Sequence, residues 1–182
     1  IIANENYKRE EKVPFAENDG RVFKEYCTKT LGIPESNIKL IIDATYNDIR
    51  YATNWLKQVL AVNNGQAKAI FYYAGHGIPD ESTKAAYLLP IDGYGTDVNT
   101  GYSLDELYNM LSNLPSQSSM VFLDACFSGT KRDGEMLASA RGVAIKVKPN
   151  ELKGNLVVFS AAQGDETAYP YKEKEHGLFT YY

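Results

Sequence analysis

The stretches IFYYAGHG (residues 70–77) and VFLDACFSG (residues 121–129) decide the fold of this chain. Each is an apolar run that ends abruptly at small residues and one reactive side chain, His76 in the first and Cys126 in the second. A continuous apolar run of this length is typical of a buried strand in a parallel sheet. Because the carboxyl ends of parallel strands meet at one edge of a sheet, we expect His76 and Cys126 to lie close together.

A cysteine and a histidine that lie close together can act as a nucleophile and its base. Cysteine attacks acyl carbons as the thiolate and needs a nearby base, a role that histidine can fill. The chain has two histidines, His76 and His176, and each lies 50 residues from Cys126. His176 follows the charged run KEKE and is expected to open a helix, whereas His76 ends an apolar strand between two glycines, so His76 is the predicted base. The backbone N–H groups of Gly77 and Cys126 are predicted to form an oxyanion hole.

Composition limits the class of protein. The 182 residues are 44% hydrophobic and 23% charged, which suits one α/β domain with a substantial core. The net charge of −4 gives no indication of a nucleic-acid partner, and no apolar run approaches the ~18–20 residues of a membrane span. The two cysteines are too few for a disulfide framework and fit a reducing compartment such as the cytoplasm, or a free reactive thiol. The first residues resemble the end of a strand and the last the start of a helix, so we expect the domain to be cut at both ends.

Apolar runs predict strands, and the segments between them predict helices. The expected strands are Ile1–Ala3, Ile38–Ile42, Ala69–Tyr73, Met120–Leu123 and Leu156–Phe159, the last three covered on both faces. Apolar residues at helical spacing predict helices at Gly20–Leu31, Tyr46–Leu60 and Leu104–Leu111, with Thr45 and Ser103 as N-terminal caps. Residues 80–99 and 129–154 are expected to be long loops. Strands that alternate with helices predict a mostly parallel central sheet with helices on both faces.

The ordered set of motifs resembles the caspase and metacaspase family of cysteine peptidases over nearly the whole chain. Besides GHG and DACFSG, the set comprises Asn4 with Tyr7, END at 17–19, LLPID at 88–92, DEL at 105–107 and FSAA at 159–162. The separation of 50 residues between His76 and Cys126 is also similar to that of caspases. Asp124 stands where animal caspases have Gln, so the resemblance is closer to metacaspases and bacterial caspase-like proteins. It implies a caspase-like three-layer α/β sandwich and a single peptidase domain over residues 1–182.

The same resemblance implies a pocket for the side chain that precedes the scissile bond. Asp19 and Asp124 match pocket positions at which metacaspase carboxylates bind Arg or Lys, whereas caspases use Arg residues there to bind Asp. Two carboxylates in a cleft complement a guanidinium through charge-assisted hydrogen bonds. Ser160 and Glu166, after the fifth strand, are expected to line the same pocket. Ala74 stands where metacaspases often have Ser, which changes the expected pocket shape.

A calcium site is a further expectation from the resemblance. Many metacaspases need calcium, and Asp92, Asp105 and Asp133 match acidic positions of that kind. Leu104 stands where an additional Asp is usual, and the loss of one carboxylate weakens a calcium site. The chemistry of a cysteine nucleophile itself requires no cofactor.

The sequence therefore predicts a cysteine endopeptidase with a His–Cys dyad that cuts proteins or peptides after Arg or Lys. The basic loop at 129–154 follows the nucleophile, so the enzyme is also expected to cut itself there. Candidate sites of self-cleavage are Lys131, Arg132, Arg141, Lys146 and Lys148. Two alternatives stay open: a catalytically silent caspase-like interaction module, and a clostripain-like or legumain-like peptidase of different specificity.

Overall fold

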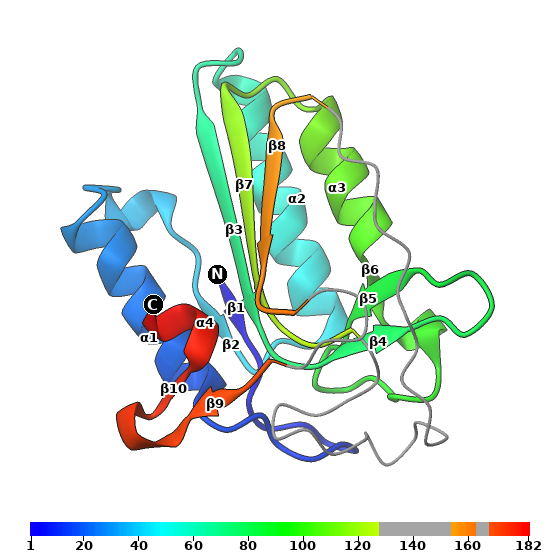
Figure 1. The fold of residues 1–182 in the computed structure, drawn as a ribbon. Helices are drawn as coiled ribbons and strands as arrows, with labels where there is room; N and C mark the ends of the chain where they lie inside the picture. The colour runs from blue at the N-terminus through cyan, green and yellow to red at the C-terminus, as the bar shows by residue number, and fades with distance from the viewer. Residues whose placement is uncertain (128–153, 163–167) are drawn as a thin grey trace.

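A five-stranded parallel sheet forms the centre of the molecule (Figure 1). The structure is a computed structural model that describes residues 1–127, 154–162 and 168–182. The strands, in their order across the sheet, are β2 (Ile41–Ile42), β1 (Ile2–Ala3), β3 (Lys68–Ala74), β7 (Ser118–Asp124) and β8 (Leu156–Ser160). The five predicted strands and their parallel arrangement are confirmed, although β1 and β2 are short.

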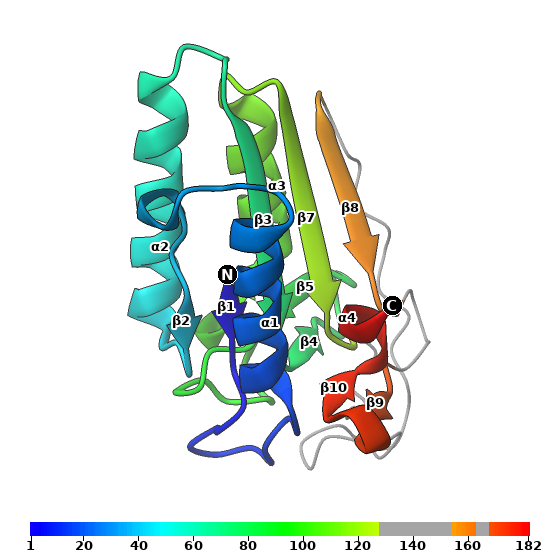
Figure 2. The same ribbon diagram turned by 90° about the vertical axis from the view of Figure 1, so that its left-hand side faces the viewer.

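Helices cover both faces of this sheet, as Figure 2 shows. Helix α1 (Ala16–Lys29) lies on one face, and α2 (Tyr46–Val62) and α3 (Leu104–Asn113) lie on the other. Side chains alternate along β3, so that Phe71 and Tyr73 pack with α2 and α3 while Tyr72 packs against Phe23 of α1. The two cores on opposite faces of one sheet make the three-layer α/β sandwich that the sequence predicts.

The predicted starts of α2 and α3 are confirmed by side-chain caps, whereas α1 begins at Ala16, before the predicted Gly20. The Thr45 hydroxyl accepts a hydrogen bond from Asp48 N, and the Asp48 carboxylate accepts one from Thr45 N at 2.9 Å. Ser103 caps α3 by accepting a hydrogen bond from Glu106 N at 3.3 Å. These caps satisfy backbone N–H groups that have no partner within the helix, and so they fix where α2 and α3 begin.

Two small sheets lie beside the carboxyl edge of the central sheet and were not predicted. The strands β4 (Gly77–Pro79), β5 (Ala86–Leu88) and β6 (Tyr102–Ser103) pair antiparallel. The expectation of a long loop at 80–99 is therefore wrong, because β5 lies inside it. The hairpin of β9 (Pro170–Tyr171) and β10 (His176–Gly177) leads into α4 (Leu178–Tyr181). Strands of two or three residues carry too little periodicity to be read from a sequence.

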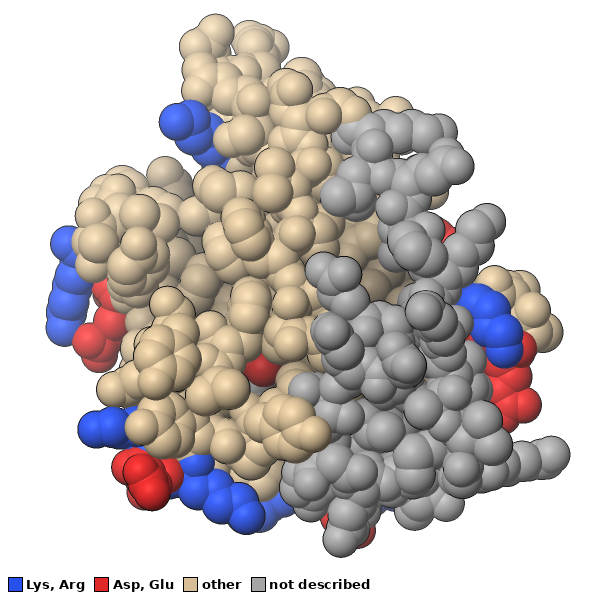
Figure 3. Space-filling view, in the orientation of Figure 1, with Lys and Arg blue, Asp and Glu red and all other residues tan. Residues whose placement is uncertain are grey.

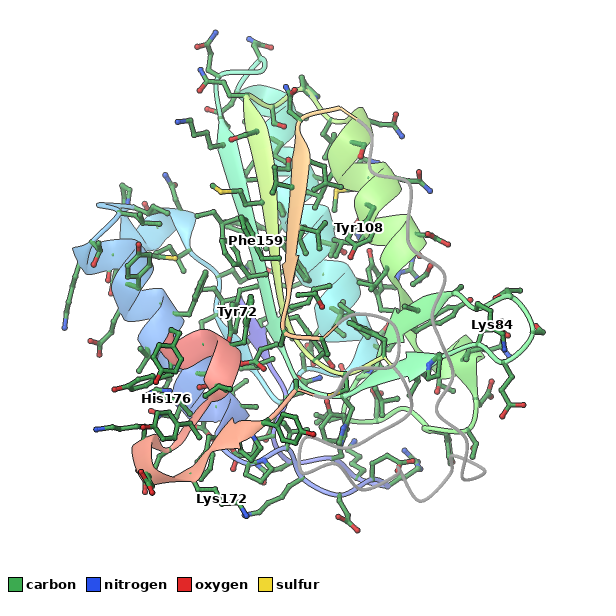
Figure 4. The ribbon with its side chains drawn as sticks, viewed as in Figure 1. Tyr72, Lys84, Tyr108, Phe159, Lys172 and His176 are labelled. Atoms are coloured by element: carbon green, nitrogen blue, oxygen red, sulfur yellow. The ribbon has the colours of Figure 1, made fainter. Side chains whose placement is uncertain are left out.

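Strand β8 is covered on only one face, which corrects the expectation that it is buried on both. Val157 is 47% exposed and Phe159 is 45% exposed, while Leu156 is buried. The cause is position, because β8 is at the edge of the sheet whereas α1 packs on β1 and β3. Phe159 stacks on Phe122 of the neighbouring strand at 5.0 Å between ring centroids (Figure 4).

Short 3-10 turns complete the described chain at Glu35–Asn37, Val98–Thr100 and Lys172–Lys174. The predicted loop at 129–154 falls almost entirely outside the described residues. In the part of the chain that the structure describes, no helix has the length and apolar character needed to cross a membrane.

Candidate active site

His76 and Cys126 lie at the same level on the carboxyl edge of the sheet. Strands β3 and β7 pair in register from Lys68 opposite Ser118 to Ala74 opposite Asp124. His76 and Cys126 each follow their strand by two positions, so the shared register places them side by side. Both residues line one small cavity, together with Val13 and Ala168. They are nearly buried, at 4% and 5% exposure, which keeps most water from their reactive atoms.

Hydrogen bonds to main-chain groups hold the His76 ring. Its Nε2 lies 2.9 Å from the carbonyl oxygen of Glu11. A carbonyl oxygen can only accept, so Nε2 carries the ring proton and Nδ1 is the nitrogen that can take up a second one. Nothing in the sequence marks this partner, because Glu11 contributes its backbone rather than its side chain.

The His76 backbone is held by two tyrosine hydroxyls. His76 N donates to Tyr7 Oη at 2.8 Å, and Tyr73 Oη donates to His76 O at 2.8 Å. The two hydroxyl oxygens lie 3.3 Å apart, and the rings of Tyr7 and His76 are 4.8 Å apart. Burial raises the pKa of Tyr7 well above its ordinary value, so its hydroxyl stays neutral. The hydroxyls of Tyr7 and Tyr73 therefore fix the position of the turn that carries the His76 ring.

We expect Tyr7→Phe to lower kcat about tenfold, because His76 N loses its acceptor and the ring loses its fixed position. The KM should change little, since Tyr7 does not line the cavity beside Cys126. The free energy of unfolding should fall by about 1–2 kcal/mol. Steady-state kinetics and urea unfolding test this, with Tyr26→Phe on the exposed face of α1 as the control. A loss of stability with unchanged kcat would contradict the positioning role.

The Cys126 sulfur lies beneath the segment that leads into β9. Ala168 N donates to Cys126 Sγ at 2.7 Å, and Ala168 O lies 3.7 Å from the same sulfur. A backbone N–H directed at sulfur stabilises negative charge on it. The Ala168 main chain therefore offers the sulfur both a donor, which suits the thiolate, and an acceptor, which suits the thiol.

Gly77 allows the backbone to approach Cys126 closely. A Cβ atom at residue 77 would lie 2.6 Å from Cys126 O and would also overlap the Phe127 ring. Glycine is therefore required where β4 begins, beside the end of β7. This approach brings the main chain of Gly77 next to the main chain of Cys126, the two groups that the sequence predicts for an oxyanion hole.

Two buried carboxylates lie near this edge and contact one short segment, residues 176–180. Asp19 on α1 is 0% exposed, and Asp124 at the end of β7 is 1% exposed. Asp124 Oδ2 accepts a hydrogen bond from Thr180 Oγ1 at 2.7 Å. Asp19 Oδ1 lies 2.8 Å from His176 Nδ1, and Gly177 N donates to both Asp19 oxygens at 3.1 and 3.0 Å. In the space-filling view, one small red area lies among tan atoms near the middle of this face (Figure 3).

Three features are typical of one protein family: the fold, the ending of β3 and β7 at the same height, and the order of the motifs along the chain. A family profile described as the caspase domain matches residues 1–182, the whole chain. The chain belongs to the caspase-domain family. Caspase domains are cysteine peptidases, which act on proteins, so the resemblance inferred from the ordered motifs is confirmed at the level of the family. No curated protein was found to match the sequence closely enough to count as a relative.

Of the two other residues predicted for the pocket of this caspase domain, Ser160 and Glu166, the structure describes only Ser160. Ser160 ends β8, next to Leu123 of β7, and its hydroxyl donates to Ala162 O at 2.7 Å. Glu166 lies outside the described residues. His176 is on β10 rather than at the start of a helix, because α4 begins two residues later. It lies beside Asp19 and is not among the residues that line the cavity of Cys126.

Two of the three residues predicted for a calcium site, Asp92 and Asp105, lie beside the starts of α2 and α3. Asp92 Oδ1 accepts a hydrogen bond from Tyr46 N at 2.9 Å, so this carboxylate caps α2. Asp105 lies in the first turn of α3. Within residues 1–127, 154–162 and 168–182, no three side chains of the His, Cys, Asp or Glu types gather as a metal ion would need. Asp133 lies outside these ranges, and a calcium site that includes it stays a prediction.

Proposed function

We propose that this caspase domain is an endopeptidase that cuts its substrates after Arg or Lys, with Cys126 as the nucleophile and His76 as the base. The observation that carries the proposal is the level ending of β3 and β7, which puts both side chains in one cavity. The nearly buried setting supports it, because a dry site strengthens the interactions among charged groups that form during reaction.

In the proposed reaction, His76 Nδ1 takes the proton from Cys126 Sγ, and the sulfur attacks the scissile carbonyl carbon. The N–H groups of Gly77 and Cys126 stabilise the negative oxygen of the tetrahedral intermediate. The imidazolium then gives its proton to the leaving amine, and a thioester remains on Cys126. Water, activated by His76, hydrolyses the thioester and restores the thiol. The Glu11 carbonyl holds Nε2–H throughout and stabilises the charged ring.

The preference for a basic residue rests on the two buried carboxylates. Asp124 is two residues before the nucleophile, and Asp19 reaches the same segment, 176–180, from α1. Buried carboxylates favour a cationic side chain through charge-assisted hydrogen bonds, and they disfavour an acidic one by repulsion. Ser160 and Glu166 complete the proposed pocket.

A panel of reporter peptides that differ only in the residue before the cut tests this function. We expect turnover after Arg and Lys and none after Asn or Asp, with no turnover of any peptide by Cys126→Ala. Cleavage after Asp would point to caspase-type specificity, and cleavage after Asn to a legumain-like enzyme. If the unaltered chain cut none of the peptides, the domain would instead be a catalytically silent interaction module.

Self-cleavage in the loop at 129–154 is a further expectation of this function, because the loop carries basic residues close to Cys126 in sequence. Mass spectrometry of the purified chain should find fragments that end at Lys131, Arg132, Arg141, Lys146 or Lys148. The Cys126→Ala chain, kept in the same solution, should stay intact. Parallel samples with calcium and with a chelator test whether calcium controls the reaction. An intact unaltered chain after long incubation with calcium would contradict self-processing.

A further inference from the structure

We propose that Thr180 and Tyr72 are positioning residues of the pocket for a basic side chain, because together they fix the orientation of the Asp124 carboxylate. The inference rests on the proposed function, in which Asp124 binds the substrate cation. It follows from two short hydrogen bonds that link three elements of the fold, β3, α4 and β7.

Asp124 is the pocket carboxylate that reaches the reactive centre. It lines the small cavity that His76 and Cys126 also line, and it is 1% exposed. Tyr72 and Thr180 are not among the residues that line this cavity. We therefore assign them an effect on substrate binding through Asp124, and not through contact with the substrate.

The direction of both hydrogen bonds follows from the number of protons that each side chain carries. Thr180 Oγ1 donates to Asp124 Oδ2 at 2.7 Å, and it lies 2.6 Å from Tyr72 Oη. A threonine hydroxyl has only one proton, so at the contact with Tyr72 it must accept. The Tyr72 hydroxyl therefore donates to Thr180, and Thr180 donates to Asp124.

The first residue of this chain of hydrogen bonds is held firmly in the core. Tyr72 is 0% exposed, and its ring stacks on Phe23 of α1 with 4.2 Å between the centroids. Tyr72 is two positions before Ala74, which pairs with Asp124 in the register of β3 and β7. Side chains two positions apart on a strand share a face, so Tyr72 and Asp124 lie on the same face of the sheet. Figure 4 shows Tyr72 beside α4, the helix that carries Thr180.

The segment that leads to Thr180 is anchored at two points. Gly177 N donates to both oxygens of Asp19 on α1, at 3.1 and 3.0 Å. Leu178 N donates to Tyr169 O at 2.9 Å. These bonds fix the start of α4, and Thr180 lies only two residues beyond Leu178. The hydroxyl that contacts Asp124 is therefore held by the main chain as well as by Tyr72.

A carboxylate with a fixed orientation should bind a guanidinium more tightly than one that rotates. A guanidinium can donate two parallel hydrogen bonds only when the plane of the carboxylate is aligned with it. The last torsion of an aspartate side chain is soft, so the bond from Thr180 restricts a rotation that would otherwise be lost on binding. One hydroxyl uses one of the roughly four lone-pair sites of a carboxylate and is compatible with a guanidinium at the same group.

Ligand binding to the Cys126→Ala chain tests the proposal without turnover. The probes are N-acetyl-arginine amide and the neutral, nearly isosteric N-acetyl-citrulline amide, with Kd measured by calorimetry at neutral pH. We expect Thr180→Val to raise the Kd of the arginine amide about tenfold and that of the citrulline amide by less than about twofold. Thr180→Ser keeps the hydroxyl and should restore most of the affinity. Thr28→Val is the matched control, because the Thr28 hydroxyl bonds only to carbonyl groups of its own helix, α1.

A second variant tests the order of the chain of hydrogen bonds. Tyr72→Phe should raise the Kd of the arginine amide about threefold, a smaller effect because Thr180 can still donate to Asp124. Added to Thr180→Val, it should raise the Kd no further, because Tyr72 acts through Thr180. Independent, multiplicative effects of the two substitutions would contradict this order.

The outcomes separate this inference from the proposed function. If the arginine amide bound no better than the citrulline amide to the Cys126→Ala chain, the basic preference of the proposed function would be wrong. If it bound better, but Thr180→Val weakened both amides equally or neither, the positioning role would be wrong. A Thr180→Ser chain as weak as Thr180→Val would also contradict the role of the hydroxyl. Should circular dichroism show that Thr180→Val does not fold, Tyr72→Phe decides, and an unchanged preference for the arginine amide would overturn the proposal.

Discussion

We expect Cys126→Ala to lower kcat/KM for an arginine reporter by about a thousandfold or more, because no other group in the cavity can form the thioester. His76→Ala should cause a loss of similar size, since the thiol then lacks its base. The double variant should be little worse than either single one, because nucleophile and base act as a unit. Steady-state kinetics measures all three, with far-ultraviolet circular dichroism to show that each variant is folded.

The chain offers its own control for the loss of a thiol. Cys27 is buried in α1, on the side of the molecule away from the cavity, and burial raises the pKa of its thiol. Cys27→Ala should keep full activity per folded molecule. His176→Ala should keep most of the activity, since His176 lies beside Asp19 and does not line the cavity of Cys126. Independent, multiplicative losses for Cys126→Ala and His76→Ala would contradict the dyad.

Asp124→Asn should reduce kcat/KM for arginine reporters by about 10- to 1,000-fold. The substitution keeps the shape of the side chain and an oxygen that can accept the hydrogen bond from Thr180, but it removes the charge. A substrate guanidinium would then be buried beside a neutral amide, and its desolvation would go uncompensated. The loss should be smaller for a citrulline reporter, because that side chain carries no charge.

The matched control for Asp124→Asn is Glu25→Gln, which removes one negative charge from the exposed face of α1. Reporter kinetics for the arginine and citrulline peptides should be unchanged in this variant. Equal losses for both peptides with Asp124→Asn would mean that Asp124 supports the fold of the cavity and does not select the substrate. A preference of the unaltered enzyme for Asp over Arg would refute the pocket outright.

Much of the fold could be predicted because the central elements carry strong local signals. Strands β3 and β7 are largely apolar and seven residues long. Thr45 and Ser103 are residue types that commonly cap helix starts, and each directly precedes a helix. The placement of His76 and Cys126 follows from the same signals, since a residue just beyond a parallel strand lies at its carboxyl edge.

The rest could not be predicted, for physical reasons that differ between residues. The Glu11 carbonyl is a backbone group that every residue possesses, so no residue type marks it. The pairing of Asp19 with His176 joins residues that are 157 positions apart, and local periodicity says nothing about such contacts. The charged run KEKE indicated a solvated segment, and nothing in the sequence indicated β10, the two-residue strand that follows it. Val157 and Phe159 of β8 are apolar yet exposed, because edge position depends on the whole sheet.

The residues that line the cavity are far apart in the sequence, and this separation has a consequence for biosynthesis. Its walls come from Val13 near the start, from the strand ends in the middle, and from Ala168 near the end. A ribosome adds about 5–20 residues per second, so the nucleophile emerges several seconds before its last neighbour in the cavity. A nascent chain that already contains Cys126 but not yet Ala168 therefore has the nucleophile without an assembled site. We expect such a peptidase to stay silent during its own translation and to gain activity only when folding has joined both halves of the chain.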